Sequence, residues 1–274
     1  METKVEKTAE EQQYVRVEVE EGVAWIRFDR PDRMNAIGQA TRTQLASALK
    51  QAERDDDVRC VVLTGTGRAF SAGADVKEMA DTGGGMHGPE EVGRVLREEY
   101  APMILRIRNM PKPVIAALNG VAAGIGASFA LAADIRIAVP DASLVEAFVG
   151  IALVPDGGAT WLLPRVIGTG KALEMFFTGR PMGAAEAERL GLVNQIVQPD
   201  EFEQTVRAIA TRLASGPTRA IAGAKRAVNR GLECGLEEAM EYESYLQEAQ
   251  AAGEDFREGV AAFVGKRAPL FKGR

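Results

Sequence analysis

Residues Pro113 to Ala138 read PVIAALNGVAAGIGASFALAADIRIA, and this stretch decides the fold class. It begins with a short strand of the buried type, Pro113 to Leu118, and passes through a glycine-rich turn into a helix of small residues, Gly124 to Ala133. Ile135 to Ala138 then predicts another strand. Strands that alternate with helices in this way are typical of an α/β fold with largely parallel strand pairing.

The same alternation continues on both sides of this stretch. Tyr14 to Glu20 and Val23 to Phe28 alternate apolar and other residues, and they predict a hairpin of half-buried strands. Helical spacing from Thr41 to Glu53 precedes a buried-type strand, Cys60 to Thr64. The other helices that we expect span Glu90 to Met110, Glu201 to Ser215, Pro217 to Arg230 and Leu236 to Ala252. We therefore expect a polar extension (1–13), an α/β core (14–200) and a helical C-terminal region (201–274).

Composition indicates an ordinary globular protein and excludes several classes. The chain has 274 residues, 46% hydrophobic and 26% charged, and a net charge of -6, so no overall basic field attracts nucleic acid or an anionic membrane. No apolar segment resembles a signal peptide or approaches the roughly 20 residues of a membrane span. Only Cys60, Cys234 and His87 carry thiol or imidazole groups, which argues against a zinc site. We expect a cytoplasmic protein with no bound metal.

Three glycine-rich segments can bring backbone amides close to a ligand. They are Thr64 to Val76, Asn119 to Ser128 and Val154 to Gly158. Glycine and alanine at the start of a helix leave N–H groups unshielded, which suits an anion or a developing oxyanion. Close helix packing through small residues is the alternative explanation. The Asn119 to Ser128 segment lacks the third glycine and the acidic partner of a dinucleotide fingerprint.

Asp156 is the only ionisable residue between Ala147 and Pro164. In such apolar surroundings desolvation raises the pKa of a carboxyl group towards the range in which it can move protons near neutral pH. A structural alternative is that Asp156 caps a helix that begins near Gly157. The local sequence leaves both interpretations open.

Several short motifs occur together along the chain. They are Arg30-Pro31 with Asn35-Ala36, Gly73-Ala74-Asp75-Val76, Lys112-Pro113-Val114-Ile115-Ala116, Asn119-Gly120, Pro155 with Gly157-Gly158, and Asp255-Phe256-Arg257-Glu258-Gly259 with Phe263 and Lys266-Arg267. Through these motifs the chain resembles the enoyl-CoA hydratase/isomerase (crotonase) superfamily. The resemblance implies an α/β crotonase (ClpP-like) spiral of ββα repeats with a helical C-terminal trimerisation region. It also implies an acyl-CoA thioester as substrate, no cofactor beyond that coenzyme A, and a homotrimer or a dimer of trimers.

The resemblance also assigns site residues. Two backbone N–H groups that hold the thioester carbonyl correspond to those of Ala74 and Ile125. The backbone of Ala72 to Asp75 would contact adenine, and Arg30, Arg33 and Lys77 are candidates for the phosphates, although plain solvation explains these cations equally well. The remaining candidates for contact with substrate or coenzyme A are Gly73, Val76, Gly124, Ser128, Phe148, Phe263 and Lys266.

The departures from the family pattern favour an isomerase. Typical hydratases of the family hold water between two glutamates, and this chain has Ser128 and Phe148 at those positions. A phenylalanine excludes water and favours proton transfer in a dry pocket. Asp156 stands where several isomerases have an acidic residue, and its setting most resembles the ring-epoxide and oxepin-CoA isomerases of phenylacetate degradation. We expect Asp156 to be the sole general acid and base: it removes a proton from the substrate, the thioester enolate rests on the two N–H groups, and Asp156 returns the proton at another carbon, which shifts a double bond or opens an epoxide.

Two other functions stay open at this point. One is an enoyl-CoA hydratase with a rearranged water site, and the other is a non-catalytic acyl-CoA binding protein of the same fold. A serine hydrolase fits poorly, because Ser71 or Ser128 would need His87, which we expect on the surface of a glycine-rich loop.

The surroundings of the expected pocket are partly predictable. Strand alternation places Glu146 on the same face as Phe148, and we expect a solvated or salt-bridged role for it at least as readily as a role in the site. Phe148, Ile125, Met79 and Met86 indicate an apolar pocket, whose acyl group the sequence leaves open.

Overall fold

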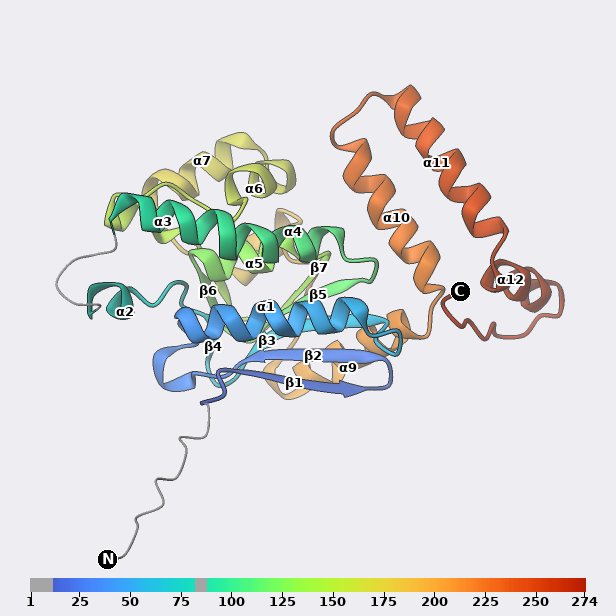
Figure 1. Cartoon of the computed structure of the whole chain (residues 1–274), viewed down its shortest axis with the longest axis horizontal. Coiled ribbons are helices and arrows are strands. Elements are labelled where there is room, and N and C mark those ends of the chain that lie inside the picture. Colours follow the sequence, from blue (N-terminus) through green and yellow to red (C-terminus); the bar gives the residue numbers. More distant parts are fainter. Residues whose placement is uncertain (1–11, 82–87) are drawn as a thin grey trace, which may run out of the picture.

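The structure is a computed structural model that describes residues 12–81 and 88–274 (Figure 1). The strands are β1 Val15–Glu20, β2 Val23–Phe28, β3 Cys60–Gly65, β4 Ala69–Ser71, β5 Val114–Leu118, β6 Val121–Ala123, β7 Ile135–Ala138, β8 Ser143–Val145, β9 Met182–Gly183 and β10 Gln195–Ile196. The longer helices are α1 Gln39–Arg54, α4 Ala101–Asn109, α5 Ile125–Ala132, α6 Ala159–Ile167, α7 Thr169–Thr178, α9 Pro199–Ala214, α10 Thr218–Gly231, α11 Leu236–Ala251 and α12 Glu254–Val264. Shorter turns of helix are η1 Pro31–Arg33, α2 Val76–Asp81, α3 Pro89–Val95, η2 Leu96–Tyr100, η3 Ala147–Ile151 and α8 Ala184–Arg189.

Two sheets form the centre of the molecule. The larger has the strand order β1-β2-β3-β5-β7-β10, and every neighbouring pair in it is parallel except the β1–β2 hairpin. The smaller has the order β4-β6-β8-β9, with parallel pairing from β4 to β8. The pairs β3/β4, β5/β6 and β7/β8 each contribute one strand to each sheet, so the chain winds as a spiral of repeated units. The expected α/β crotonase spiral is confirmed.

Helix α5 lies at the centre of this spiral. All its residues are buried, as expected for a helix that is apolar on all sides except for the small Ser128. The ring of Phe129 lies 6.3 Å from that of Phe28 and 6.2 Å from that of Tyr100, so aromatic packing fixes the helix between the larger sheet and η2. Helices α4 and α6 contact α5 as well. The N-terminal end of α5 is therefore a rigid position in the fold.

Some predicted elements differ in detail. The segment that we expected as one helix from Glu90 to Met110 is α3, a π-helical turn (η2) and α4 in succession. The first hairpin is not half-buried on both strands, because β1 is an exposed edge strand after Val15 while β2 lies inside the sheet. Helix α12 is additional to the predicted helices. The predicted extension 1–13 lies outside the described residues except for Gln12 and Gln13.

The C-terminal helices form an arm that leaves the core. Helix α9 contacts β2 and β3, whereas α10 and α11 pack against each other and extend away from the sheets, and α12 follows at the far end (Figure 1). Lys225 anchors the base of the arm, since its Nζ donates to Asp134 Oδ2 at 2.7 Å and to the Ile107 carbonyl at 2.8 Å. Across the described residues, no helix combines the length and the hydropathy needed to cross a membrane.

Candidate active site

The N–H group of Ala74 is left out of the local backbone pairing. Ile37 pairs with this segment by donating to the Gly73 carbonyl at 2.8 Å and by accepting from the Asp75 N–H at 3.1 Å. These hydrogen bonds use the residues before and after Ala74, and neither uses the Ala74 N–H. Its N–H is available to a ligand.

The N–H group of Ile125 is available for a different reason. Ile125 is the first residue of α5, and the first N–H groups of a helix have no acceptor within that helix. Gly124 before it donates to the Val145 carbonyl at 2.8 Å, which ties the start of α5 to the end of β8. The positive end of the helix dipole adds to the preference for negative charge at this point.

Glycines bring these two N–H groups close together. Gly73 has a φ of +88°, and a Cβ on it would lie 2.7 Å from the Ala123 carbonyl oxygen, which directly precedes Gly124. A Cβ on Gly126 would lie 2.8 Å from Ser71 Cβ. The loop that carries Ala74 thus packs directly on the first turn of α5, at distances that exclude side chains. This is the close approach that the glycine-rich segments predict.

The turn that carries Asp156 also rests on α5. Gly157 has a φ of +59°, and a Cβ there would lie 2.6 Å from both Ile125 Cδ1 and Ser128 Cβ. Ser128 Oγ donates to the Asp156 carbonyl at 2.9 Å. Asp156 is therefore held beside Ile125, the first residue of α5, whose N–H is available to a ligand.

The Asp156 carboxyl group is partly buried, and one of its oxygens lacks a hydrogen-bond partner among the described residues. Its Oδ1 atom is inaccessible and has no hydrogen bond within the described part of the chain. Burial raises the pKa of Asp156 to about 6. The alternative that Asp156 caps a helix is wrong, because the N-cap of α6 is Gly158 and no side chain caps this helix. A carboxylate that titrates near neutral pH can take and return a proton.

Glu146 is a second buried carboxyl group, and its expected role at the surface is wrong. Its side chain is 1% exposed, and Oε2 has no hydrogen-bond partner among the described residues. Burial, and then the charge of Asp156, raise the pKa of Glu146 to about 8. The strand alternation expected through Phe148 is also absent, since β8 ends at Val145 and a 3-10 turn, η3, follows. A single acidic residue between the apolar Val145 and Ala147 is the sequence signal that indicates this position.

Phe148 and Ser128 line the same region without supplying an acid or a base. Phe148 is buried, and its Cζ lies 3.8 Å from the point where a Cβ on Gly124 would stand. Ser128 is fully buried, with its hydroxyl directed at the Asp156 carbonyl. The structure thus places Ser128 beneath the turn, and its contact with substrate stays a prediction.

Tyr100 is a further residue that the sequence did not indicate. It is 5% exposed, its hydroxyl oxygen has no hydrogen bond among the described residues, and the Asp156 charge is one of its electrostatic neighbours. Burial raises the pKa of the Tyr100 phenol to about 12, and the nearby Arg42 guanidinium opposes this shift. The phenol is therefore neutral at physiological pH.

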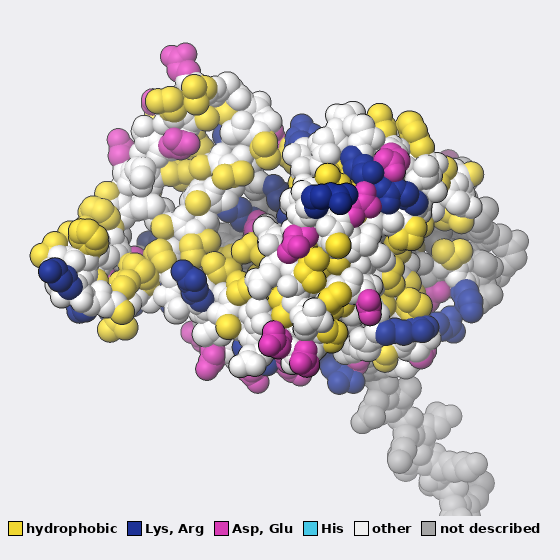
Figure 2. All heavy atoms as spheres, turned by 180° about the vertical axis from the view of Figure 1, so that it is seen from behind, with side chains coloured by type: hydrophobic (Ala, Val, Ile, Leu, Met, Phe, Trp, Pro, Cys, Tyr) yellow, Lys and Arg dark blue, Asp and Glu magenta, His cyan; other side chains and the backbone are white. Residues whose placement is uncertain are grey.

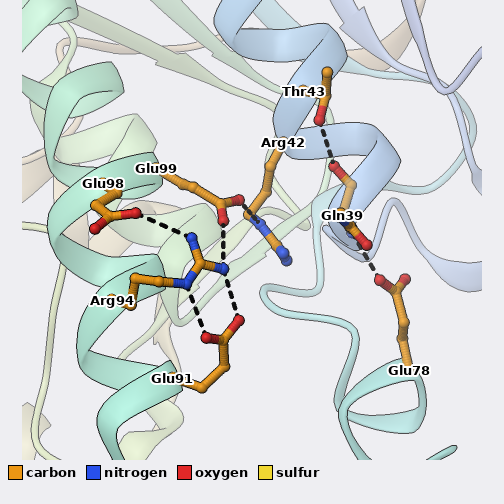
Figure 3. A network of polar contacts seen from close by, with 8 residues as sticks. All are labelled: Gln39, Arg42, Thr43, Glu78, Glu91, Arg94, Glu98 and Glu99. Carbon is orange, nitrogen blue, oxygen red and sulfur yellow. Dashed lines mark hydrogen bonds and ion pairs between the residues drawn. The ribbon is translucent and has the colours of Figure 1, made fainter. Parts of the chain in front are cut away.

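Ion pairs hold the segment that carries Tyr100 against α1 (Figure 3). Arg42 on α1 pairs with Glu99 at 2.6 Å, and Arg94 on α3 bonds to Glu91 on the same helix. On the other side, the Gln39 N–H donates to Glu78 of α2 at 2.8 Å. This network links α1 to both segments that border the site.

The candidates for coenzyme A contact are only partly brought together. Ala72, Arg33 and Lys77 are exposed near the Ala74 loop, as is Val76, whereas Gly73 is buried. Arg30 is engaged within the protein, because it pairs with Asp75 at 3.0 Å and donates to the Ala36 carbonyl at 3.1 Å. The pKa of Asp75 is lowered despite its burial, first because its Oδ1 accepts from the Glu78 N–H and so caps α2, and then because of the Arg30 ion pair. The phosphate role of Arg30 stays a prediction.

Phe263 and Lys266 lie elsewhere in the chain. Both are exposed, and they belong to α12 and the residues after it, at the opposite end of the molecule from α2 (Figure 1). Within one chain they do not meet the Ala74 loop. Of the other residues that we named, Met86 and His87 lie outside the described residues, as does the side chain of Met79.

The described residues include no group of three or more His, Cys, Asp or Glu side chains that could hold a metal ion. What the site does contain is two backbone N–H groups left out of the local pairing, at Ala74 and Ile125, with the buried carboxyl group of Glu146 and the partly buried one of Asp156 beside them. Such an arrangement can stabilise negative charge on a carbonyl oxygen and move protons next to it.

Fold and site together define a member of the enoyl-CoA hydratase/isomerase family. Residues 18–274 match that family, and the chain belongs to it. A Rhodobacter capsulatus protein named "Probable enoyl-CoA hydratase" is 44% identical over 260 residues, covering 95% of this chain and 98% of its own. The 1,2-epoxyphenylacetyl-CoA isomerase of Escherichia coli is 39% identical over 263 residues, covering 96% and 99%. The crystal structure of an enoyl-CoA hydratase from Bacillus anthracis superposes with a TM-score of 0.90 at 34% identity, covering 96% of this chain and 100% of the other.

Proposed function

We propose that this protein is an acyl-CoA isomerase that moves a double bond, or opens an epoxide ring, through a thioester enolate. The position of Asp156 carries the proposal. Its partly buried carboxyl group, whose pKa is raised to about 6, stands on a turn packed against Ile125 at the start of α5. Such a group is ionised at neutral pH and is still basic enough to accept a proton from carbon.

The reaction uses the two N–H groups and the carboxylate together. The thioester carbonyl oxygen accepts hydrogen bonds from Ala74 and Ile125, which stabilise the negative charge that develops as Asp156 removes a proton. The enolate is then protonated at a different carbon, so that the double bond has moved. Each N–H donor of this kind contributes about 10²-fold to 10³-fold in rate.

Two features favour isomerisation over hydration. Phe148 and Ser128 stand where typical hydratases of the family carry their glutamates, and Phe148 covers Gly124 with an apolar ring. Neither side chain can activate a water molecule as a glutamate does, and the apolar ring of Phe148 favours the exclusion of water. The 39% identity to the 1,2-epoxyphenylacetyl-CoA isomerase of Escherichia coli also supports an isomerase, with an aromatic-derived acyl group as one substrate class to test.

Hydration of a 2-enoyl-CoA is the second candidate. Glu146 beside Asp156 gives the site two carboxyl groups, which is the number that holding and activating a water molecule requires. The 44% identity to the Rhodobacter capsulatus protein also favours this candidate. The two functions differ in whether water adds to the product.

A panel of acyl-CoA thioesters tests the proposal. Wild type and Asp156→Asn are assayed with 2-enoyl, 3-enoyl, dienoyl and epoxide-containing thioesters, and mass spectrometry separates isomers from hydrated products. Asp141→Asn, an exposed aspartate, is the matched control. We expect isomerisation by wild type and the control, with a loss of about 10²-fold to 10⁴-fold in Asp156→Asn.

Two outcomes would contradict the proposal. A product that has gained the mass of water at a substantial rate would favour the hydratase. Tight binding of the thioesters without conversion of any of them would favour a non-catalytic acyl-CoA binding protein.

We further propose that the enzyme works as a homotrimer or a dimer of trimers. The arm of α10 to α12 exposes large apolar side chains, and hydrophobic side chains gather on the face of the arm that Figure 2 shows. Exposed apolar patches are typical of surfaces that contact another protein. The exposed side chains include Leu236, Met240, Phe256, Val260, Phe263 and Val264. Packing against a neighbouring subunit would bury them, and it would allow Phe263 and Lys266 to approach coenzyme A bound at a neighbour's Ala74 loop. Light scattering coupled to size exclusion tests this, since a monomeric mass would contradict it.

The proposed reaction needs no cofactor beyond the coenzyme A of the substrate. A proton leaves one carbon and another arrives at a second, so no electrons are exchanged. The two free cysteines, Cys60 and Cys234, fit a reducing compartment such as the cytoplasm, where we propose that the enzyme acts.

A further inference from the structure

Glu146 lies between β8, a strand of the smaller sheet, and the site. It directly follows Val145, whose carbonyl accepts the Gly124 N–H at 2.8 Å, so it stands next to the first turn of α5. Its side chain is 1% exposed, and its Oε2 atom is buried without a partner among the described residues. An unpaired buried carboxyl group is costly, and such groups are most often kept for a function.

Asp156 lies against the same turn of α5, on the segment between η3 and α6. Ser128 Oγ donates to the Asp156 carbonyl at 2.9 Å, and it also lies 3.4 Å from the Gly124 carbonyl oxygen, one turn earlier in α5. Gly124 is the residue that Val145 holds. Glu146 and Asp156 therefore flank one turn of helix, the turn that offers the Ile125 N–H.

Other charges near Glu146 are engaged elsewhere. The surrounding elements β6, β8, β9, α5 and η3 contain no ionisable side chain. Helix α7, which contacts η3, carries Lys171 and Glu174, and these pair with each other at 2.9 Å. Arg180 after α7 pairs with Glu174 at 2.7 Å and with Glu186 at 2.8 Å. No cation among the described residues pairs with Glu146.

Asp156 likewise has no cation paired with it among the described residues. Tyr100 faces it from η2 as a neutral phenol. Arg165 on α6 lies over the Trp161 ring, 3.8 Å from its centroid, and donates to the Trp161 carbonyl. The charge of Asp156 therefore acts on Glu146 without a screening cation. Two neighbouring carboxyl groups in this position hold one proton between them.

We propose that Glu146 is the second proton-carrying residue of the isomerase site, with ionised Asp156 removing the proton from one substrate carbon and neutral Glu146 delivering a proton to another. This inference rests on the isomerase function proposed above. It replaces the expectation that Asp156 is the only acid and base: Asp156 is the base, and Glu146 is the acid.

The proton balance closes over one turnover. The first C–H bond breaks towards Asp156, which becomes a neutral acid, while the enolate oxygen is held by Ala74 and Ile125. A new C–H bond forms with the proton of Glu146, which becomes a carboxylate. The proton then passes from Asp156 to Glu146, which restores the starting state without an added reactant.

The direction of the pKa shifts agrees with these roles. Burial raises the pKa of Asp156 to about 6 and, together with the Asp156 charge, that of Glu146 to about 8. Between these values Asp156 is ionised and Glu146 is protonated. Two groups whose pKa values are pushed apart in one site are the expected base and acid.

Glu146→Gln tests the proposal, because the amide keeps the shape of the side chain and cannot donate an acidic proton. The exposed Glu201→Gln is the matched control. Isomerase kcat/KM is measured from pH 5 to pH 9 with the thioester that wild type converts best. We expect a fall of about 10²-fold or more in kcat for Glu146→Gln, with thioester binding retained, and loss of the decline that wild type shows above about pH 8.

Reaction in D₂O gives a readout that a structural role of Glu146 would not change. A proton from Glu146 exchanges with solvent before delivery, so wild type should place deuterium on the second carbon. In Glu146→Gln, Asp156 alone would return the proton that it removed, and the product should retain more protium. A variant with the wild-type rate, pH profile and deuterium incorporation would overturn the proposal while leaving the isomerase function standing.

A titration of the carboxyl groups covers the case in which Glu146→Gln fails to fold. With ¹³C-labelled glutamate, we expect one carboxyl group to titrate near pH 8 in wild type and at lower pH in Asp156→Asn, which lacks the neighbouring charge. If no glutamate in wild type titrates above pH 7, the proposal is overturned. If the titration is as expected but no thioester is isomerised, the proposed function has failed instead.

Discussion

Replacing Gly157 with alanine should damage the site, because the turn that carries Asp156 has no room for a methyl group at this position. Gly157 has a φ of +59°, and its Cβ would lie 2.6 Å from Ile125 Cδ1 and 2.6 Å from Ser128 Cβ. The end of the Ile125 side chain can rotate away. Ser128 Cβ cannot, because it is fixed to a buried helix. The turn that carries Asp156 must therefore move away from α5.

Two costs add to give the expected destabilisation. A left-handed backbone conformation costs an alanine about 1–2 kcal/mol, and forcing a methyl group into a packed site costs about 1–3 kcal/mol. We expect Gly157→Ala to lower the free energy of unfolding by about 2–5 kcal/mol. A displacement of about 1 Å at a catalytic group can cost about 10²-fold in rate, so kcat/KM should fall by at least that factor.

Urea denaturation and isomerase kinetics measure the two effects. Gly170→Ala is the matched control, because Gly170 lies in α7 at negative φ with open space around its Cβ position. This control should keep the wild-type rate and lose no stability. If Gly157→Ala matched wild type in both stability and kcat/KM, the packing of the Asp156 turn on α5 would be refuted.

The other predictions concern the polar groups around the same turn. Ser128→Ala removes the hydrogen bond to the Asp156 carbonyl, so it should lower the free energy of unfolding, measured by urea denaturation, by about 1 kcal/mol. The value of kcat should fall as well, by more than this loss of stability explains, and an unchanged kcat would show that the bond does not position Asp156. Tyr100→Phe removes a buried hydroxyl group that makes no hydrogen bond within bonding distance among the described residues, although the Arg42 guanidinium lies near it. The free energy of unfolding should therefore change by less than about 1 kcal/mol, and a larger loss would show that Arg42 bonds to this hydroxyl. Burial raises the folded-state pKa of Asp156 from 3.8 to about 6, so the folded protein binds this proton more tightly than the unfolded chain. The stability of wild type relative to Asp156→Asn should therefore fall by roughly 2.5 kcal/mol from pH 4 to pH 7, and a constant difference across that range would contradict the shift.

The regular elements of the fold could be predicted because their patterns are local. Cys60 to Thr64 and Ile135 to Ala138 are short apolar runs bounded by turns, and each proved to be a buried strand of the parallel sheet. Helix α12 was harder, because Gly253, Gly259 and Gly265 weaken the helical signal within and around it. The sequence pattern alone also could not separate α3, η2 and α4, because the residues of a π-helical turn do not differ in type from those of the α-helices beside it.

The site was predictable in part. Asp156 is conspicuous because it is alone in an apolar run, and the close approach of Gly73 to α5 follows from the glycine-rich segments. Glu146 was misjudged because its alternation with Phe148 imitates a strand, whereas β8 ends one residue earlier. Tyr100 comes to the site through tertiary packing on Phe129, which no local pattern indicates.

The central claim is that Asp156 is the base that begins isomerisation. The pH dependence of isomerase kcat/KM in wild type and Asp156→Asn tests it most directly. We predict that wild-type activity rises through about pH 6 as Asp156 loses its proton, and that Asp156→Asn lacks this rise and is slower by about 10²-fold to 10⁴-fold. An Asp156→Asn variant with the wild-type rate and the same rise near pH 6 would contradict the claim.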